Sequence, residues 1–369
     1  MQLRKTVVTF ASVIVAAGML SMGLQAQAAK NWKDRAEYDL YDAITKDNNL
    51  ATRLANLDKW KTNYAASEYA DVRQRIYLVT YQGMNNHRAA FDMATEILKA
   101  DPNDQTSLQE ILGFVRALVP QDPKAALSAQ NKADLETAEK AAHYVITNAD
   151  SVYGAAKKPA GVADDVWAKT KPTMTNFAQF TLGWIGATQK DTGKAEAELI
   201  KTLQADPTNA QASYMLASNL LSQQKDHPEK VPFALFEYAR SAVYDGPGAL
   251  DAKARPGIDA FFAKAYAGYH GSAKGADDVK ALAKTNALPP SDFAIKSVVD
   301  FAKEEEEKRL KLQGENPSLA FWMQNKEQLV GDGGAAYWEM MKGLAVPGGS
   351  VPGGKFKANL ISASPETKP

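Results

Sequence analysis

The sequence predicts an all-α protein built as an α-solenoid, a row of helix pairs in which each pair packs mainly on its neighbours. Apolar residues recur every three to four positions through most of the chain, which is the spacing of one helix face. The tripeptide Ala-Asp-Pro closes two of these periodic segments, at residues 100–102 and 205–207. Such internal self-similarity is typical of repeat architectures, whose size is not limited by one shared core.

The clearest repeat unit is the stretch 177–207, FAQFTLGWIGATQKDTGKAEAELIKTLQADP. Leu182 and Gly186 lie four residues apart and therefore share one face of a first helix. Gly183, which has no side chain, allows a second backbone to approach that face closely. The first half of the stretch therefore predicts a helix with a close neighbour.

The second half of the stretch predicts that neighbour. Gly193 is expected to allow the turn, Ala195 and Leu199 form a small-then-large seam, and Pro207 ends the helix because proline cannot continue it. These offsets resemble the tetratricopeptide repeat, a helix-turn-helix unit of about 34 residues. The resemblance covers roughly residues 67–243. It implies about four to six helix pairs, whose first helices line a concave surface that binds a partner.

The other elements follow from the same period and from the breakers between segments. Residues 151–172, with breakers at Gly154, Pro159 and Gly161, predict an irregular connection, and the prolines at 120 and 123 mark an insertion within a repeat. One further pair has its turn at Asn85-Asn86 and ends at Asp101-Pro102, and the next begins at Gln105. The remaining helices are predicted at residues 32–45, 50–66, 134–148, 210–221, 232–243, 257–269, 277–286, 292–313, 318–330 and 335–343.

The N-terminal residues predict export. MQLRK is basic, residues 6–24 are apolar and small, and Ala26-Gln27-Ala28 supplies a small-x-small cleavage pattern. We therefore interpret residues 1–28 as a cleavable signal peptide and expect a periplasmic or secreted protein that is not inserted in a membrane after cleavage. An uncleaved anchor is the alternative, because the apolar run approaches the roughly 20 residues that span a bilayer.

The mature chain is predicted to have three parts. Residues 30–290 form the solenoid, residues 291–346 form a C-terminal helical extension, and residues 347–369 form a short irregular tail with a Gly/Pro linker. Residues 355–362 alternate in polarity like one β-strand, but a lone strand has nothing to pair with. The tail either docks on the solenoid or belongs to a domain that continues elsewhere.

The composition excludes several classes of function. Lys+Arg and Asp+Glu both total 43, so the near-neutral chain offers no electrostatic case for binding nucleic acid. The absence of cysteine excludes disulfides, thiolate metal sites and a cysteine nucleophile. The acidic run 304–307 precedes three basic residues, which predicts a solvated helix face with ion pairs at i,i+4: Glu304–Lys308, Glu305–Arg309 and Glu307–Lys311.

Short motifs of known enzymes occur without their companions. Ser222 and Lys225 have the Ser-x-x-Lys spacing of penicillin-recognising enzymes, but the Ser-Asp-Asn and Lys-Thr-Gly elements are missing. Asp191-Thr-Gly193 lies at a predicted turn between helices, and residues 349–355 resemble a P-loop without its hydroxyl residue. None of the four histidines has a partner at a ligand spacing. We therefore expect no catalytic residues, no metal, no cofactor and no enzymatic activity.

The remaining signal is the predicted groove. The resemblance implies that the second, fifth and ninth repeat positions point into it, and an aromatic patch with polar flanks suits an extended peptide or a partner helix. The alternative is that the aromatic residues pack against the segment 151–172. The residues placed in the groove are Phe177, Phe180, Trp184, Tyr214, Arg75 and Gln109.

The functional hypothesis is thus a non-catalytic, exported scaffold or adaptor that binds a protein or peptide along this groove. Two alternatives stay open. One is an envelope enzyme whose catalytic residues carry no local motif and lie in a polar cleft. The other is a passive structural component of a larger envelope assembly, which would present a broad apolar patch.

Overall fold

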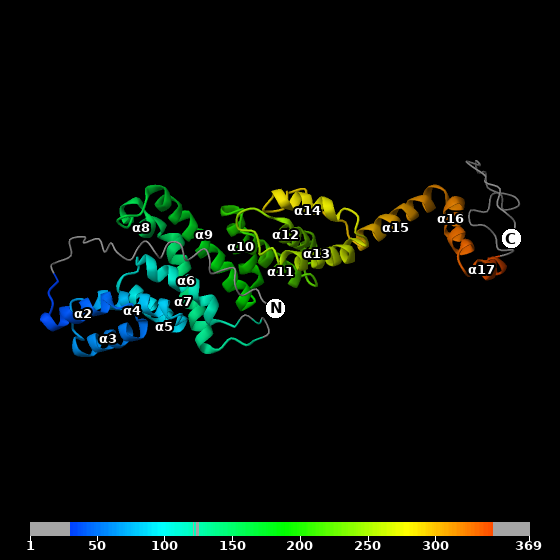
Figure 1. Ribbon diagram of the computed structural model, residues 1–369. Helices are drawn as coiled ribbons and strands as arrows, with labels where there is room; N and C mark the ends of the chain where they lie inside the picture. Colours follow the sequence, from blue (N-terminus) through cyan, green and yellow to red (C-terminus); the bar gives the residue numbers. More distant parts are fainter. Residues whose placement is uncertain (1–29, 121, 123–124, 342–369) are drawn as a thin grey trace. The chain divides into compact units, whose positions relative to one another are not determined.

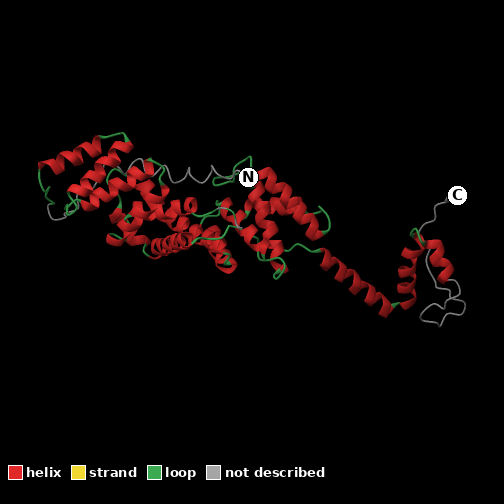
Figure 2. Ribbon diagram, turned by 90° about the horizontal axis from the view of Figure 1, so that it is seen from below, coloured by secondary structure: helices red, strands yellow, loops and turns green. Residues whose placement is uncertain are grey.

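The computed structural model describes residues 30–120, 122 and 125–341, and this part of the chain is entirely helical with connecting loops (Figure 2). Consecutive helices pack against one another along the sequence, as an α-solenoid requires (Figure 1). The prediction of an all-α, solenoid-like fold is confirmed. The predicted signal peptide, the predicted linker and the possible strand lie outside the described residues.

The chain divides into two compact units, which we describe separately. The first unit extends to Tyr266 and includes Lys274–Phe293; the second holds Ala267–Ala273 and the chain from Ala294 onward. The first unit contains α2 (Arg35–Lys46), α3 (Leu50–Asn63), α4 (Ala70–Gly83), α5 (His87–Ala100), α6 (Gln105–Leu118), α7 (Ala129–Thr147), α8 (Ala149–Tyr153), the short 3-10 helix η1 (Ala155–Lys157), α9 (Asp164–Gln189), α10 (Thr192–Ala205), α11 (Ala210–Ser222), the 3-10 helix η2 (Pro228–Lys230), α12 (Val231–Val243), most of α13 (Arg255–His270) and α14 (Ala276–Thr285).

Local capping explains why most predicted helix ends lie close to the observed ones. Asn85 adopts a left-handed conformation with φ 54°, and Asn86 caps α5 by accepting a hydrogen bond from the Ala89 amide. Both Ala-Asp-Pro tripeptides behave alike: α5 and α10 end at the alanine, and the aspartate is the C-cap. The self-similarity read from the sequence is therefore present in the backbone.

The prediction of an irregular connection over residues 151–172 is wrong in its second half. Helix α9 begins at Asp164 and contains Pro172 in its interior. Proline removes one backbone donor, but Trp167 and Met174 on either side of it are buried. Two aspartates in the first turn also suit the positive end of the helix dipole. The burial of these side chains in the tertiary structure thus outweighs the tendency of proline to break a helix.

The turn between α9 and α10 also differs from the prediction. Lys190, with φ 62°, adopts the left-handed conformation at the end of α9, whereas Gly193 is the second residue of α10. Asp191 caps α10 by accepting a hydrogen bond from the Lys194 amide at 3.0 Å. The helix end is thus determined by the aspartate cap, so no glycine is needed in the turn.

The close approach of α9 and α10 is confirmed. A Cβ atom on Gly186 would lie 2.7 Å from the backbone nitrogen of Ala195, and one on Gly183 would lie 2.7 Å from Cγ of Leu199. Ala195 and Leu199 are both fully buried. The two glycines therefore permit a contact that any side chain would obstruct.

Ion pairs connect the second helices of successive pairs in the first unit. In each ion pair, one side chain lies on the second helix of a helix pair, and the other lies on the second helix of the adjacent pair or on the short turn that precedes it. They are Arg88 of α5 with Asp134 of α7, Lys194 of α10 with Glu139 of α7, and Lys230 of η2 with Glu196 of α10. Their partial burial reduces screening by solvent, so they help to fix the stacking of one pair on the next.

The second unit consists of α15 (Val298–Glu315), α16 (Pro317–Val330) and α17 (Gly334–Met341), each packed on the next. The charged face of α15 forms as predicted, but the i,i+4 pairing is wrong: Lys308 pairs with Glu305 at 2.7 Å and Arg309 with Glu306 at 2.6 Å, both at i,i+3. Large apolar side chains such as Trp338 are exposed on this unit. Within residues 30–341, apart from the three undescribed positions, no helix has the length and apolarity to span a membrane.

Candidate functional site

One face of α6 is open. Thr106, Gly113 and Ala117 are exposed on it, and half-buried Gln109 lies between them. Their spacing of three or four residues places them on one side of the helix. A Cβ atom on Gly113 would have no other atom within 4 Å. We call these four residues the α6 face, and it is open at Gly113.

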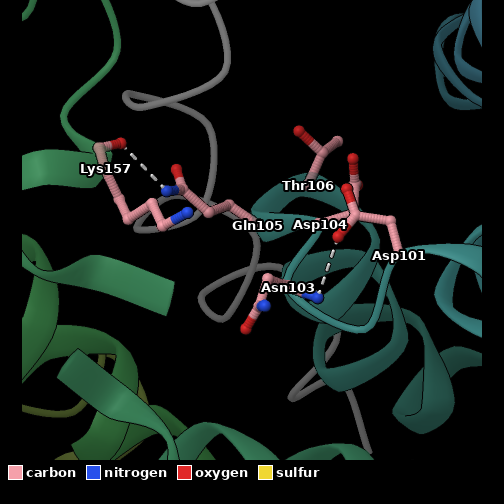
Figure 3. Close-up of a pocket in the computed structure, with 6 residues that line it drawn as sticks. All are labelled: Asp101, Asn103, Asp104, Gln105, Thr106 and Lys157. Atoms are coloured by element: carbon pink, nitrogen blue, oxygen red, sulfur yellow. Dashed lines mark hydrogen bonds between the residues drawn. The ribbon is translucent and has the colours of Figure 1, made fainter. Parts of the chain in front are cut away.

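A polar recess adjoins the first residue of the α6 face. It is a hollow of about 310 Å³ lined by residues of the α5–α6 turn, the start of α6 and η1: Asp101, Asn103, Asp104, Gln105, Thr106 and Lys157. Figure 3 shows Lys157 and Asp101 on opposite sides of it, with Gln105 between them. The Gln105 side-chain amide donates hydrogen bonds to the carbonyls of Val152 at 2.8 Å and Lys157 at 3.2 Å. The recess therefore presents carboxylate, amide, hydroxyl and ammonium groups in one place.

Arg75, which the sequence placed in the groove, lies beside this recess. Its Nε donates to Oδ2 of Asp104 at 3.0 Å, and its Nη2 donates to Oδ2 of Asp101 at 3.2 Å. Asp104 is also the N-cap of α6, since its other oxygen accepts a hydrogen bond from the Ser107 amide. The arginine thus ties α4 to the start of α6 and balances the charge of the two aspartates.

At the other end of α6, an arginine covers two aromatic rings. Phe180 and Trp184 of α9 are only 5% and 6% exposed. Cζ of Arg116 lies 5.4 Å from the Phe180 ring centroid and 5.8 Å from that of Trp184. Both distances suit a cation–π interaction, and burial lowers the pKa of Arg116. The two rings therefore offer little surface of their own.

The other two predicted aromatic residues are half-buried. Phe177 packs on the same core as Trp184, and Met215 packs on both the core containing Trp184 and the core containing Phe180. Tyr214, next to that methionine, meets the ring of Tyr238 edge-on at 6.0 Å. We call Phe177, Phe180, Trp184 and Tyr214 the aromatic strip. The structure thus places Phe177 and Trp184 in one core and Phe180 in the adjoining core, whereas the printed ring contact of Tyr214 is with Tyr238.

Sequence reasoning missed three residues of this region. Arg116 was not singled out because nothing local shows that it reaches α9. Tyr238 lies on a second helix, outside the repeat positions considered. Phe261 is 44% exposed and lies 4.7 Å from the ring of Tyr238. Counted from the predicted helix start at residue 257, Phe261 occupies the fifth repeat position, so the same repeat rule would have identified it.

Two carboxyl groups have raised pKa values outside the recess. Burial raises the pKa of Glu110 on α6 to about 7, opposed by a hydrogen bond from Gln82, and burial raises the pKa of Glu237 on α12 to about 8. Neither glutamate lines the recess. In the described part of the chain, no cluster of three or more His, Asp or Glu side chains could hold a metal ion. The recess thus presents polar groups, and the two carboxyls with raised pKa values lie outside it.

The enzyme-like motifs have structural roles. The Ser222 hydroxyl donates to the carbonyl of Asn219 at 2.7 Å near the end of α11, and Asp191 is a helix cap. The P-loop-like residues lie outside the described part of the chain. No activation of a nucleophile is visible at Ser222, because its hydrogen bond goes to its own helix.

The fold and this site define an all-α, solenoid-like protein with an open helix face between a polar recess and a cation–aromatic cluster. Comparisons of the chain with family models, with curated proteins and with solved structures found no match.

Proposed function

We propose that the protein is a non-catalytic, exported scaffold or adaptor of the tetratricopeptide-repeat type that binds an extended protein or peptide segment along the α6 face. The observation that carries the proposal is the open position at Gly113, between a recess rich in hydrogen-bonding groups and an arginine stacked on aromatic rings. An extended segment needs hydrogen-bond partners at intervals and at least one apolar or cationic anchor. The recess supplies hydrogen-bonding groups at the start of α6, and Arg116, stacked on Phe180 and Trp184 of α9, supplies a cationic group near its end.

Site-specific photo-crosslinking in cells tests this proposal. A photoreactive residue at Ala117 is expected to capture a discrete protein, whereas one at exposed Glu136 on α7 is not. Introducing Gly113→Trp beside the Ala117 probe is expected to abolish the adduct, because the indole fills the open position. Gly113→Ala serves as the control and should leave the adduct unchanged.

The captured partner then allows a quantitative measurement. Gly113→Trp is expected to weaken its binding by about tenfold or more, which corresponds to about 1.4 kcal/mol. Equal adducts at the two probe positions, or unchanged affinity in Gly113→Trp, would contradict the adaptor proposal and favour a passive structural component.

Export is a separate part of the proposal and rests on residues 1–28. Intact mass spectrometry of the protein from the native cell is expected to show a chain that starts just after Ala28. A full-length mass would contradict cleavage and support the uncleaved anchor.

A further inference from the structure

A glutamate is fully buried where α12 packs against α11 and α14. Glu237 of α12 is 0% exposed, and neither of its carboxyl oxygens has a hydrogen-bond partner in the described part of the chain. The hydroxyl of Ser213 on α11 is near enough to act against the rise in the pKa of this carboxyl, but it is buried and not aligned for a hydrogen bond within the described residues. An isolated carboxylate is costly at such a place, so the neutral acid is the stable form in the folded chain.

The charged groups around Glu237 only partly offset this cost. Burial raises its pKa to about 8, while Ser213 and the positive charge of Arg240 act to lower it. On α14, Lys280 pairs with Asp259 at 2.7 Å and with Asp277 at 3.8 Å, and Lys284 pairs with Asp245 at 2.8 Å. From α13, Arg255 donates to the carbonyl of Tyr244. Arg240 is therefore the cation that acts directly on this carboxyl.

Arg240 holds the end of α14. Its Nη1 donates to the carbonyls of Ala283 at 3.1 Å and Asn286 at 2.9 Å, and its Nη2 donates to the carbonyl of Pro207. Ala283 is in the last turn of α14, and Asn286 is its C-cap. A cation at this position also suits the negative end of the helix dipole. One side chain thus ties α14 to α12 and to the loop after α10.

Glu237 and Arg240 are three residues apart on α12, a spacing at which side chains meet on a helix surface. We propose that they form a pH-sensitive latch: with Glu237 protonated, Arg240 holds the carbonyls at the end of α14, and when the proton leaves to solvent the guanidinium moves to the carboxylate and α14 is released. This latch is independent of the proposed partner binding. It makes the packing of α14 on α12 respond to alkaline pH.

The direction of the pH effect follows from linkage. The raised pKa in the closed state means that α14 is held most firmly at low pH. Opening that exposes Glu237 becomes easier by about tenfold per pH unit as pH rises toward 8, and then levels off. A glutamine at position 237 cannot titrate, so Glu237→Gln removes the pH dependence of opening while keeping the shape of the side chain.

Hydrogen–deuterium exchange of the full chain, with labelling times corrected for intrinsic rates, tests the latch at pH 6 and pH 8.5. Protection of the α14 peptides is expected to fall by at least about tenfold at the higher pH in the wild type and to stay constant in Glu237→Gln and Glu237→Leu. Peptides from α5 and α6 are the internal reference, and Glu229→Gln, which changes an exposed carboxyl near the start of α12, should behave as the wild type. A wild type whose α14 protection does not change with pH, or a pH-dependent loss that persists in Glu237→Gln, would overturn the proposal.

Discussion

Replacing Arg240 by methionine is expected to lower the free energy of unfolding by about 3–5 kcal/mol, because several backbone carbonyls lose a charged hydrogen-bond donor at once. The substitution deprives three backbone carbonyls of their donor while keeping a side chain of similar length. It also removes the guanidinium whose Cζ lies 4.5 Å from the ring centroid of Tyr244. Each buried carbonyl left without a partner costs about 1–3 kcal/mol, so the expected loss is large.

Urea denaturation monitored by circular dichroism measures this loss as a shift of the midpoint at constant slope. The control is Arg35→Met on α2, because Arg35 is exposed and its i,i+4 ion pair with Asp39 contributes less than about 1 kcal/mol. Adding Glu237→Leu to Arg240→Met is expected to recover part of the stability, since it removes the buried carboxyl as well. A loss as small as that of the control would show that Arg240 does not hold α14.

Replacing Gly186 by alanine is expected to destabilise the protein by about 2–3 kcal/mol, the upper range for an overpacked core. The new Cβ would lie 2.7 Å from the backbone nitrogen of Ala195 and 3.0 Å from its Cα. Backbone cannot move aside as the end of a side chain can. Helices α9 and α10 would therefore have to separate, which would disturb the seam formed by Ala195 and Leu199.

The same substitution at Gly113 is the matched control, since both glycines lie inside helices. Nothing lies within 4 Å of a Cβ at Gly113, so Gly113→Ala should stabilise the chain by about 0.5–1 kcal/mol through helix propensity alone. Thermal unfolding under identical conditions measures both effects: the melting temperature should fall in Gly186→Ala and rise in Gly113→Ala. Equal shifts in both variants would mean that α9 and α10 are not in close contact at Gly186.

Much of the fold was predictable from local sequence. Helix starts at Asn86 and Asp104 follow from side chains that cap backbone amides, and helix ends before Pro102 and Pro207 follow from the geometry of proline. The close approach at Gly183 was predictable because a glycine in a helix interior is unfavourable unless another group needs the space, whereas the still closer backbone contact at Gly186 was not predicted. These are short-range effects, and so the sequence by itself determined them.

The candidate site was predictable only in part. The repeat offsets pointed to Trp184, Tyr214 and Arg75, and each of them does take part in contacts between helices. Their repeat positions could not show how much surface they expose. Arg116 covers the aromatic rings from a helix that is distant in sequence, and Arg75 is held by two aspartates.

By itself, the sequence determined that the chain is all-α, where most helices begin and end, and which small residues allow helices to meet. Only the tertiary structure decided that Pro172 lies inside a helix, that Phe180 and Trp184 are buried under Arg116, and that Glu237 is enclosed beside Arg240. The physical reason is that burial and charge pairing depend on groups far apart in the chain. Outside the contacts within one repeat, no local pattern encodes which residue of one helix will lie against a helix that is distant in the sequence.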